Sequence, residues 1–529
     1  MLTTPRALNG MVTSPHHLAS QAGLQVLRDG GTAIEAAVAC IACLTVLYPH
    51  MTGIGGDSFW LILRDEAEPI AIDACGVTGA NVDANLYQRN GLASIPQRGP
   101  LAANTVAGTI AGWDAALKIS NGWQPGLPLS RILRDAIDYA DGGFPVTRSQ
   151  AELTTEKLSG LLPITGFADT FTIEGKVPSE GAIMRLRPLA RTLRQLAEEG
   201  LDSFYRGSLS RLVAADLDEA GAPLTLDDLN DYRPLQPTPL KVRVTGAQLF
   251  NMPPPTQGLS SLMILALFDR LGVTAPEGFD HIHGLVEATK QAFLVRDREI
   301  CDPQFMRMPA SEFLRTELLD DLAGRIDPDA ALPWPAAPSA GDTVWIGAVD
   351  REGRSVSLIQ SIFFEFGSGV VLRDTGINWQ NRGCSFSLDP NARNTMRPRV
   401  KPFHTLNPAM ARFDDGRSMV YGTMGGEGQP QTQAALFSRY AWFNTPLQES
   451  ITAPRWLLGR TWGDATATLK LEDRVAPDVL AALGAAGHDV ELVPAFSSMM
   501  GHAGAIVRHP NGLLEGASDP RSDGAVAAW

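Results

Sequence analysis

Apolar positions in the first part of the chain recur with helical spacing. Residues 17–28 form one such run, which ends at Asp29-Gly30-Gly31, and residues 33–48 form a second, almost wholly apolar run. Thr32 directly precedes the second run and Glu35 stands three residues later, which is the spacing of a capping box. Residues 58–75 read instead as two apolar segments around a charged turn, a pattern that indicates a β-hairpin.

The periodicity changes at residue 342. Between residues 127 and 330 the spacing is mostly helical, as in LSRILRDAIDYADGG and MRLRPLARTLRQLAEEG, each closed by a glycine that suits a helix end. The strand-like segment LKVRVTGAQLFNM interrupts these helices. After residue 343 short alternating strands dominate, such as TVWIGAVD, SVSLIQSIF, SMVYGT and AGAIVRH. The chain is therefore predicted to be helix-rich before this joint and strand-rich after it.

A Pro/Ala-rich stretch leads into the joint, where Gly341-Asp342 precedes Thr343 at the start of a predicted strand. A threonine hydroxyl needs an adjacent base to act as a nucleophile. If the chain is cut before Thr343, the freed α-amine, with a pKa of about 7.7–8.0, can act as that base. Threonines commonly begin strands, however, so this segment alone favours an ordinary strand start.

Acyl transfer also requires donors for the developing oxyanion. GTMGGEGQPQTQ at 422–433 offers adjacent glycines between a strand end and a helix, where backbone N–H groups can point into a site. An ordinary strand-to-helix turn explains the same residues equally well.

Composition narrows the class of protein. The chain has 529 residues and a net charge of −14, without a basic run, which argues against nucleic-acid or anionic membrane surfaces. We see no secretory signal, and the longest apolar stretch, 36–48, is too short to cross a bilayer. The five cysteines include one close pair, Cys40 and Cys43, which is typical of core residues in an apolar helix. An odd cysteine count without a signal predicts a cytoplasmic protein.

An ordered set of motifs covers nearly the whole chain: GMVTSPHHLASQAGLQVLRDGGTAIEAAVA, MTGIGGDSFWLI, NTVAGTIAGW, NMPPPTQG, DTVWIGAVDREGRSVSLIQSIFFEFGSG, TMGGEGQPQTQ and EGASDPRSDGAVAAW. These motifs resemble those of the γ-glutamyltranspeptidases, a family of N-terminal-nucleophile hydrolases. Each segment alone is weak evidence, but the complete ordered set is specific.

The resemblance implies an α/β (α+β) fold, a four-layer αββα sandwich built as one composite domain. It implies a precursor that cuts itself between Asp342 and Thr343, leaving a large subunit, 1–342, associated with a small subunit, 343–529. Aligned on VDREG and FGSG, the family's nucleophile falls on Thr343, its second hydroxyl on Ser361 and its oxyanion-hole glycines on Gly425 and Gly426. No cofactor or metal is implied. A homodimer of processed heterodimers is compatible with the resemblance.

The residues that give this family its γ-glutamyl specificity differ here. Asn81 stands where we place the arginine that clamps the substrate α-carboxylate, and Phe363 replaces a substrate-binding asparagine. Arg382 and Ser385 replace a glutamine and the aspartate that pairs with the α-ammonium. His404 and Thr405 replace a serine pair.

This exchange of charges predicts a substrate that keeps a carboxylate but lacks the amino-acid amine. Since Arg recognises carboxylates through two parallel N–H donors, Arg382 is the expected clamp, and Phe363 is expected to make the site smaller and drier. A short carboxylated amide such as oxamate fits, and the family includes an oxamate amidohydrolase branch in purine catabolism. Glutathione hydrolase or γ-glutamyltransferase activity, a dicarboxylic-acyl (cephalosporin-type) acylase, and a non-catalytic binding protein remain as alternatives.

Several side chains also have structural interpretations. Arg382 could form an ion pair with Asp389 or Glu365, and His404 could pack beside the site. His16-His17 lies at a helix start, and His281 and His283 are expected on opposite sides of a helix, so neither pair is predicted to bind metal.

Overall fold

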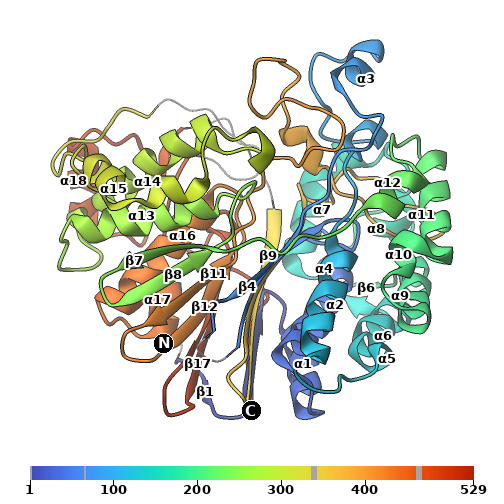
Figure 1. Cartoon of the computed structure of the whole chain (residues 1–529), viewed down its shortest axis with the longest axis horizontal. Coiled ribbons are helices and arrows are strands. Elements are labelled where there is room, and N and C mark those ends of the chain that lie inside the picture. The colour runs from blue at the N-terminus through green and yellow to red at the C-terminus, as the bar shows by residue number, and fades with distance from the viewer. Residues whose placement is uncertain (1–2, 65–66, 335–341, 460–466) are drawn as a thin grey trace.

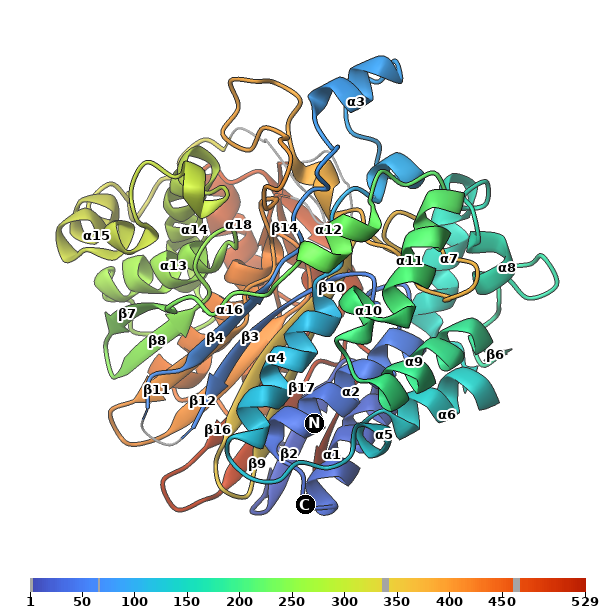
Figure 2. The ribbon, with the colours of Figure 1, turned by 45° about the vertical axis from the view of Figure 1, so that its right-hand side comes forward.

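The computed structural model of the chain describes residues 3–64, 67–334, 342–459 and 467–529. Two antiparallel sheets stack face to face at the centre, and helices cover the outer face of each sheet (Figures 1 and 2). The expected αββα sandwich is therefore confirmed. Residues 335–341, which include most of the Pro/Ala-rich stretch and Gly341, lie outside the described residues.

Both sheets combine strands from the two sides of residue 342. In spatial order, the six-stranded sheet contains β18 (Ala525–Ala528), β2 (Gly10–Ser14), β9 (Asp342–Asp350), β10 (Ser355–Phe363), β3 (Asp57–Leu63) and β4 (Ile70–Ala74). The seven-stranded sheet contains β1 (Arg6–Ala7), β17 (Leu514–Ser518), β16 (Ala503–Arg508), β12 (Ser418–Thr423), β11 (Ala409–Phe413), β8 (Ala247–Asn251) and β7 (Leu240–Val244). The predicted hairpin at 58–75 is the pair β3–β4.

Helices α1, α2 and α4 pack on the six-stranded sheet, with a helical lobe beyond them, and the helices from α13 onward cover the other sheet (Figure 1). The first group comprises α1 (His17–Arg28), α2 (Ala33–Leu47), α3 (Ala84–Arg89), α4 (Thr109–Asn121), α5 (Leu129–Ile132), α6 (Arg134–Gly142), α7 (Arg148–Leu161), α8 (Phe167–Phe171), α9 (Arg187–Glu199), α10 (Ser203–Arg206), α11 (Ser208–Glu219) and α12 (Leu226–Asp231). The second comprises α13 (Gly258–Arg270), α14 (Phe279–Glu299), α15 (Thr316–Ala323), α16 (Gly428–Phe437), α17 (Leu447–Thr452) and α18 (Pro477–Ala485).

Minor elements complete the fold. Small sheets are formed by β5 (Phe144–Pro145) with β6 (Ile183–Met184), and by β13 (Trp456–Leu458), β14 (Leu469–Glu472) and β15 (Val490–Val493). Single 3₁₀ turns occur at Pro100–Ala102, Pro303–Phe305, Ala310–Leu314, Arg382–Ser385 and Ser498–Met500, and a π turn at Ser438–Trp442.

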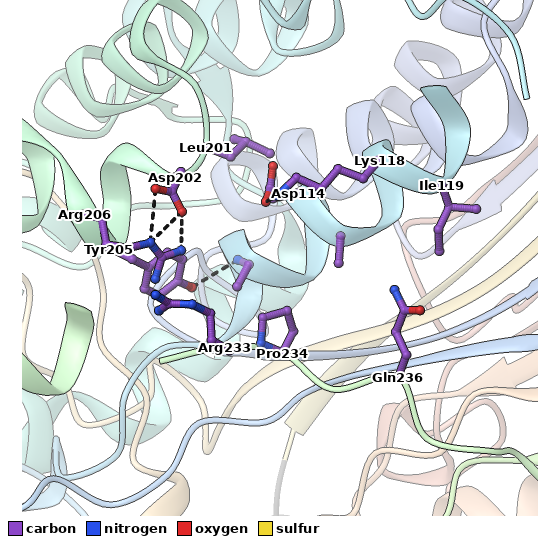
Figure 3. Close-up of a pocket in the computed structure, with 12 residues that line it drawn as sticks. Asp114, Lys118, Ile119, Leu201, Asp202, Tyr205, Arg206, Arg233, Pro234 and Gln236 are labelled. Carbon is purple, nitrogen blue, oxygen red and sulfur yellow. Dashed lines mark hydrogen bonds and ion pairs between the residues drawn. The ribbon is translucent and has the colours of Figure 1, made fainter. Parts of the chain in front are cut away.

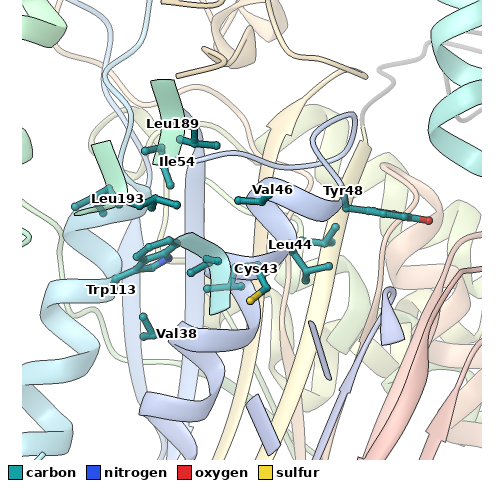
Figure 4. Close-up of a cluster of buried hydrophobic side chains, with 14 of the residues drawn as sticks. Val38, Cys43, Leu44, Val46, Tyr48, Ile54, Trp113, Leu189 and Leu193 are labelled. Atoms are coloured by element: carbon teal, nitrogen blue, oxygen red, sulfur yellow. The ribbon is translucent and has the colours of Figure 1, made fainter. Parts of the chain in front are cut away.

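Helix α2 is the buried centre of the first helical layer. The capping box predicted from the sequence is present, since Thr32 Oγ1 accepts from Glu35 N and Glu35 Oε2 accepts from Thr32 N, at 3.2 and 2.7 Å. Every residue of α2 is buried, and Cys43 lies among apolar side chains near Trp113 and Val46 (Figure 4). Cys40 and Cys43 are thus core residues with free thiols, as expected. None of the described helices is long and apolar enough to cross a membrane.

Two segments each contain two elements where their periodicity suggested a single one. The helical pattern at 129–143 is split at Leu133 into α5 and α6. The strand-like segment at 240–252 is a hairpin, β7–β8, that turns at Thr245-Gly246. Both boundaries depend on tertiary packing, which periodicity alone does not encode.

Strand β9 lies in the interior of the six-stranded sheet, between β2 and β10. Its side chains alternate: Val344 and Ile346 face the helices, whereas Trp345 and Val349 face the second sheet. Thr343, two residues before Trp345, therefore points between the sheets. The Trp345 indole occupies space that glycines leave open, because a Cβ at Gly422 or Gly504 would come within 2.2 or 2.4 Å of its ring. This contact fixes β9 against β12 and β16.

We expect Gly422→Ala to destabilise the protein by about 1–3 kcal/mol, the usual result of adding a methyl group to a filled core. The rigid indole is held by an Nε1 hydrogen bond to Ser357 Oγ at 2.9 Å, so it cannot swing aside. Thermal and denaturant unfolding measure the effect. The control is Gly484→Ala in α18, where a Cβ meets no atom within 4 Å and stability should be unchanged or higher. Equal stability of the two variants would contradict the packing described for Trp345.

Candidate active site

Thr343 is buried at the beginning of β9, with 1% of its surface exposed. Opposite it, β10 contains a bulge: Gln360 pairs with Val344 but Phe363 pairs with Asp342, so Ser361 and Ile362 together face Thr343. Ser361 is also buried, and its Oγ accepts from Phe363 N at 2.8 Å. The bulge thus brings the two predicted hydroxyl residues to adjacent positions on neighbouring strands.

The loop from β12 to α16 carries the glycine pair. Gly425 and Gly426 have φ values of 117° and 51°, which glycine adopts without steric cost. Their carbonyls are fixed, since Gly425 O accepts from Gly428 N at 2.7 Å and Gly426 O accepts from Gln257 Nε2 at 2.7 Å. The N–H of Gly426 shares its peptide unit with the held Gly425 carbonyl, and the N–H of Gly425 shares its unit with the Met424 carbonyl, which accepts from Thr423 Oγ1 at 2.7 Å. The orientations of the two candidate donor peptides are therefore set in advance, as an oxyanion hole requires.

Gln429, in the first turn of α16, contacts the candidate nucleophile directly. Its Nε2 lies 3.4 Å from Thr343 Oγ1, within hydrogen-bond distance. This contact joins the start of β9 to the segment that carries Gly425 and Gly426.

Arg382 is almost completely buried, with its guanidinium stacked 3.8 Å from the centre of the Phe363 ring. Nε and Nη2 donate to Phe403 O, and Nη1 donates to Thr405 Oγ1 at 3.2 Å. Burial lowers the pKa of Arg382 to about 10, so the group remains a cation at neutral pH. Ser385 Oγ donates to the same Phe403 carbonyl at 3.3 Å. Arg382, Phe363, Ser385 and Thr405 thus form one contacting group, and their role in substrate binding stays a prediction.

Phe363 has an uncommon backbone conformation, with φ at 80°. A non-glycine residue in this region carries a conformational cost of about 1–3 kcal/mol, and such residues cluster at functional sites. Here the conformation ends the β10 bulge and places the aromatic ring under the guanidinium. Phe363 was expected to restrict the site, and the structure gives it a second role, that of supporting Arg382 through a cation–π contact.

The structural ion pair with Asp389 or Glu365, which was the alternative interpretation of Arg382, does not form. Among the described residues, no carboxylate lies within ion-pair distance of its guanidinium. Glu365 instead pairs with Arg98 at 3.5 Å, and Asp389 is exposed and caps its own turn by accepting from Asn391 N. A buried guanidinium without a carboxylate partner carries a desolvation cost that no opposite charge offsets.

A buried acid that the sequence analysis missed lies beside this group. Asp57 begins β3 directly opposite Ser361, and its Oδ1 accepts from Gly76 N, Gly108 N and Gln380 Nε2. Its Oδ2 is 3.2 Å from His404 Nε2. Burial raises the pKa of the Asp57 carboxyl to about 7, although these hydrogen bonds and Arg382 oppose the rise. Burial together with the Arg382 charge lowers the pKa of His404 well below its ordinary value, so His404 donates as a neutral imidazole.

Cys75 joins Asp57 and His404 in one compact buried cluster. Asn81 differs from these residues in being exposed, in the turn before α3, whereas Arg382 and its partners are mostly buried. The sequence offered one signal for this cluster, an aspartate directly after the glycines of GIGGD at a strand start. That signal could not show which side chains from other strands would meet it.

The other histidines have local structural partners. His16 caps α1 by accepting from Leu18 N at 3.2 Å. His281 contacts Ser438, whereas His283 contacts His488 at 2.9 Å, so the two diverge as expected. Glu287 lies near His283 and His488, but Lys290 pairs with it at 2.7 Å and Leu332 N also donates to it.

A separate surface pocket of about 470 Å³ lies between α4, α10 and the segment at 233–236. Its wall includes the ion pair of Arg206 with Asp202, together with Asp114, Lys118 and Arg233 (Figure 3). It shares no residue with the group around Thr343 and lacks the convergent polar groups of that site.

Comparisons with known proteins agree with the fold and show the family. A family model described as gamma-glutamyltranspeptidase matches residues 19–529. An oxamate amidohydrolase proenzyme of Klebsiella pneumoniae is 54% identical over 524 residues, covering 98% of both chains. The glutathione hydrolase-like YwrD proenzyme of Bacillus subtilis is 41% identical over 519 residues, again covering 98% of both. The crystal structure of a cephalosporin acylase from Bacillus halodurans is 32% identical, with a TM-score of 0.91 over 100% of this chain and 97% of that one.

The stacked sheets and these structural neighbours define the fold as that of the N-terminal-nucleophile hydrolases. Within that class, the chain belongs to the γ-glutamyltranspeptidase family, and it is an amidohydrolase that acts on C–N bonds.

Asp57 should make stability depend on pH. Its pKa is higher in the folded chain than the value of about 3.9 expected for an unfolded one. The folded state therefore binds the proton more tightly, and the unfolding free energy should fall as pH rises from about 4 to about 7 and then level off. In Asp57→Asn this loss should disappear, which calorimetric Tm measurements across pH can test. The exposed Asp280→Asn serves as control, and parallel pH curves for wild type and Asp57→Asn would exclude the assignment.

Proposed function

We propose that the chain matures by cutting itself before Thr343 and then hydrolyses the amide of a small, carboxylate-bearing substrate resembling oxamate. The observation that carries the substrate class is Arg382, a buried cation whose described neighbours include no carboxylate within ion-pair distance. Three of its five N–H groups have acceptors among the described residues. One hydrogen on each terminal nitrogen remains for two parallel bonds to a substrate carboxylate.

Maturation begins at the peptide bond between Asp342 and Thr343. The Thr343 hydroxyl attacks the Asp342 carbonyl carbon, a C–O bond forms as the C–N bond breaks, and the proton passes to the released nitrogen. Water then hydrolyses the ester, which leaves a carboxylate on Asp342 and a free amine on Thr343. The buried site and the bulge at Ser361 support this step because they hold the hydroxyl in one place.

Turnover would reuse the same atoms. The α-amine of Thr343 takes the hydroxyl proton as Oγ attacks the substrate amide carbon, and Ser361 lies on the neighbouring strand to orient the hydroxyl. The N–H groups of Gly425 and Gly426 would bind the oxyanion. The amide nitrogen leaves as ammonia with the transferred proton, and water releases the acyl group. With oxamate the products are ammonia and oxalate.

Asp57 does not offer the counter-ion that a γ-glutamyl substrate requires. Its Oδ1 already accepts three hydrogen bonds and its Oδ2 accepts one from His404, so little capacity remains for an α-ammonium. This supports an oxamate-like substrate over glutathione. The similarity to a cephalosporin acylase favours a dicarboxylic-acyl amide as the second candidate, since that substrate also presents a carboxylate.

Thr343→Ala should remain a single chain of 529 residues, whereas wild type should give fragments 1–342 and 343–529 by intact mass. Thr343→Ser keeps a hydroxyl and should still be cut. Efficient cleavage of Thr343→Ala at the same bond, or a wild-type chain that stays intact after long incubation, would refute the maturation step.

Arg382→Lys should raise the KM for oxamate by about 10- to 100-fold, because a planar fork is replaced by a point charge and bonds to a charged group contribute about 1.5–3 kcal/mol. Slow hydrolysis of acetamide, which has no carboxylate, serves as the matched control and should change little.

Comparing kcat/KM for oxamate, a dicarboxylic-acyl amide and a γ-glutamyl anilide separates the candidate substrate classes. A clear preference for the γ-glutamyl compound would overturn the proposed substrate class.

A further inference from the structure

A chain of three buried amide contacts leads from the backbone to the nucleophile. Asn407 Nδ2 donates to Thr405 O at 3.0 Å and to Gln429 Oε1 at 3.1 Å. Gln429 Nε2 in turn lies 3.4 Å from Thr343 Oγ1. All four residues are at most 1% exposed, so water cannot easily substitute for any member of the chain.

The backbone carbonyl of Thr405 fixes the direction of these bonds. A carbonyl oxygen only accepts, so the end of Asn407 that faces it must be the NH2 group. The same NH2 group faces Gln429, which must therefore present its oxygen to Asn407. The NH2 group of Gln429 is then the end that faces Thr343. The assignment follows from the network and not from the placement of a single amide.

Gln429 is held in place at both its backbone and its side chain. Its N donates to Gly426 O at 3.3 Å, within the glycine turn, and its residue lies in the first turn of α16. Gln257 Nε2 joins the two ends of the network by donating to Thr405 O at 2.8 Å and to Gly426 O at 2.7 Å. The amide that faces the nucleophile and the candidate oxyanion hole thus belong to one rigid unit.

We propose that Gln429 is a further catalytic residue, which donates a hydrogen bond to Thr343 Oγ, and that Asn407 is the positioning residue that keeps the Gln429 amide in the donating orientation. This deepens the proposed function and rests on Thr343 as the nucleophile. A donor on one lone pair of Oγ directs the hydroxyl proton away from Gln429, toward the base. It also stabilises the negative charge that develops on Oγ as the proton leaves. The 3.4 Å separation is typical of a catalytic contact that shortens during reaction.

Gln429→Met tests the donor, because it keeps length and volume but has no N–H. We expect kcat for oxamate to fall about 10- to 100-fold with KM within about twofold, and self-cleavage to slow as well, since the same hydroxyl attacks there. If the variant does not mature, the half-time of cleavage, followed by intact mass on folded protein, becomes the readout. A kcat and a cleavage rate both within about twofold of wild type would overturn the proposal.

Gln429→Glu distinguishes donation from packing. A protonated carboxyl can donate to Thr343 Oγ while its carbonyl accepts from Asn407, but a carboxylate can only accept. The kcat ratio of Gln429→Glu to Gln429→Met should therefore rise about tenfold or more as pH falls through the pKa of the new carboxyl. A ratio that does not change with pH would show that the side chain only fills space.

Asn407 is tested by a double-mutant cycle. If Asn407 acts through Gln429, Asn407→Leu lowers kcat in the wild-type background but causes no further loss in Gln429→Met. Additive losses would overturn the positioning role.

Wild-type maturation and turnover are measured in parallel, so that failure of the proposed function can be told from failure of this inference. An uncleaved, inactive wild type refutes the proposed function, whereas an active wild type with unaffected Gln429 variants refutes only this inference.

Discussion

The packing of Trp345 between the two sheets is the interaction on which the site depends. The indole fills the space left by Gly422 and Gly504, and so locks β9 of one sheet against β12 and β16 of the other. Thr343 lies two residues before Trp345 on the same face, and Gly425 lies just beyond the end of β12. The candidate nucleophile and the candidate oxyanion hole therefore come from different sheets, and this contact between the sheets helps to set their separation. Protein cores are packed densely enough for such a contact to define geometry to a fraction of an ångström.

Electrostatics within the site follow from burial. Arg382 keeps its charge in a dry environment because an aromatic face, the Phe403 carbonyl and the Thr405 hydroxyl contact it. Asp57, close by, receives four hydrogen bonds, yet burial still favours its neutral form at mildly acidic pH. The arrangement combines a buried cation that has no carboxylate partner among the described residues with a buried acid whose oxygens are already hydrogen-bonded, which suits a substrate that brings a negative charge and no positive one.

Local rules were sufficient for much of the fold. The capping box at Thr32 and Glu35, the hairpin of β3 and β4, and the alternation in β9 each depend on residues close in sequence, so they could be predicted. The resemblance to the γ-glutamyltranspeptidases then pointed to Thr343, Ser361, Gly425 and Gly426 as candidate site residues. The cluster of Asp57, His404 and Cys75 could not be predicted, because His404 meets Asp57 across 347 residues of sequence, although Cys75 follows β4 of the same hairpin. Gln429 was hidden for another reason: GQPQTQ reads as an ordinary polar helix start, and only the backbone carbonyl of Thr405 reveals what its amide does.

The interleaving of strands in the six-stranded sheet bears on how long a cut enzyme would last. Strand β9 lies between β2 and β10, and β10 pairs in turn with β3, so residues on both sides of position 342 alternate across the sheet. After a cut before Thr343, neither fragment could leave without exposing whole rows of unpaired strand edges. Dilution would therefore not separate the fragments as it separates ordinary subunits. The lifetime of the complex would equal the lifetime of the fold itself, a property set by an unfolding barrier and not by a dissociation constant.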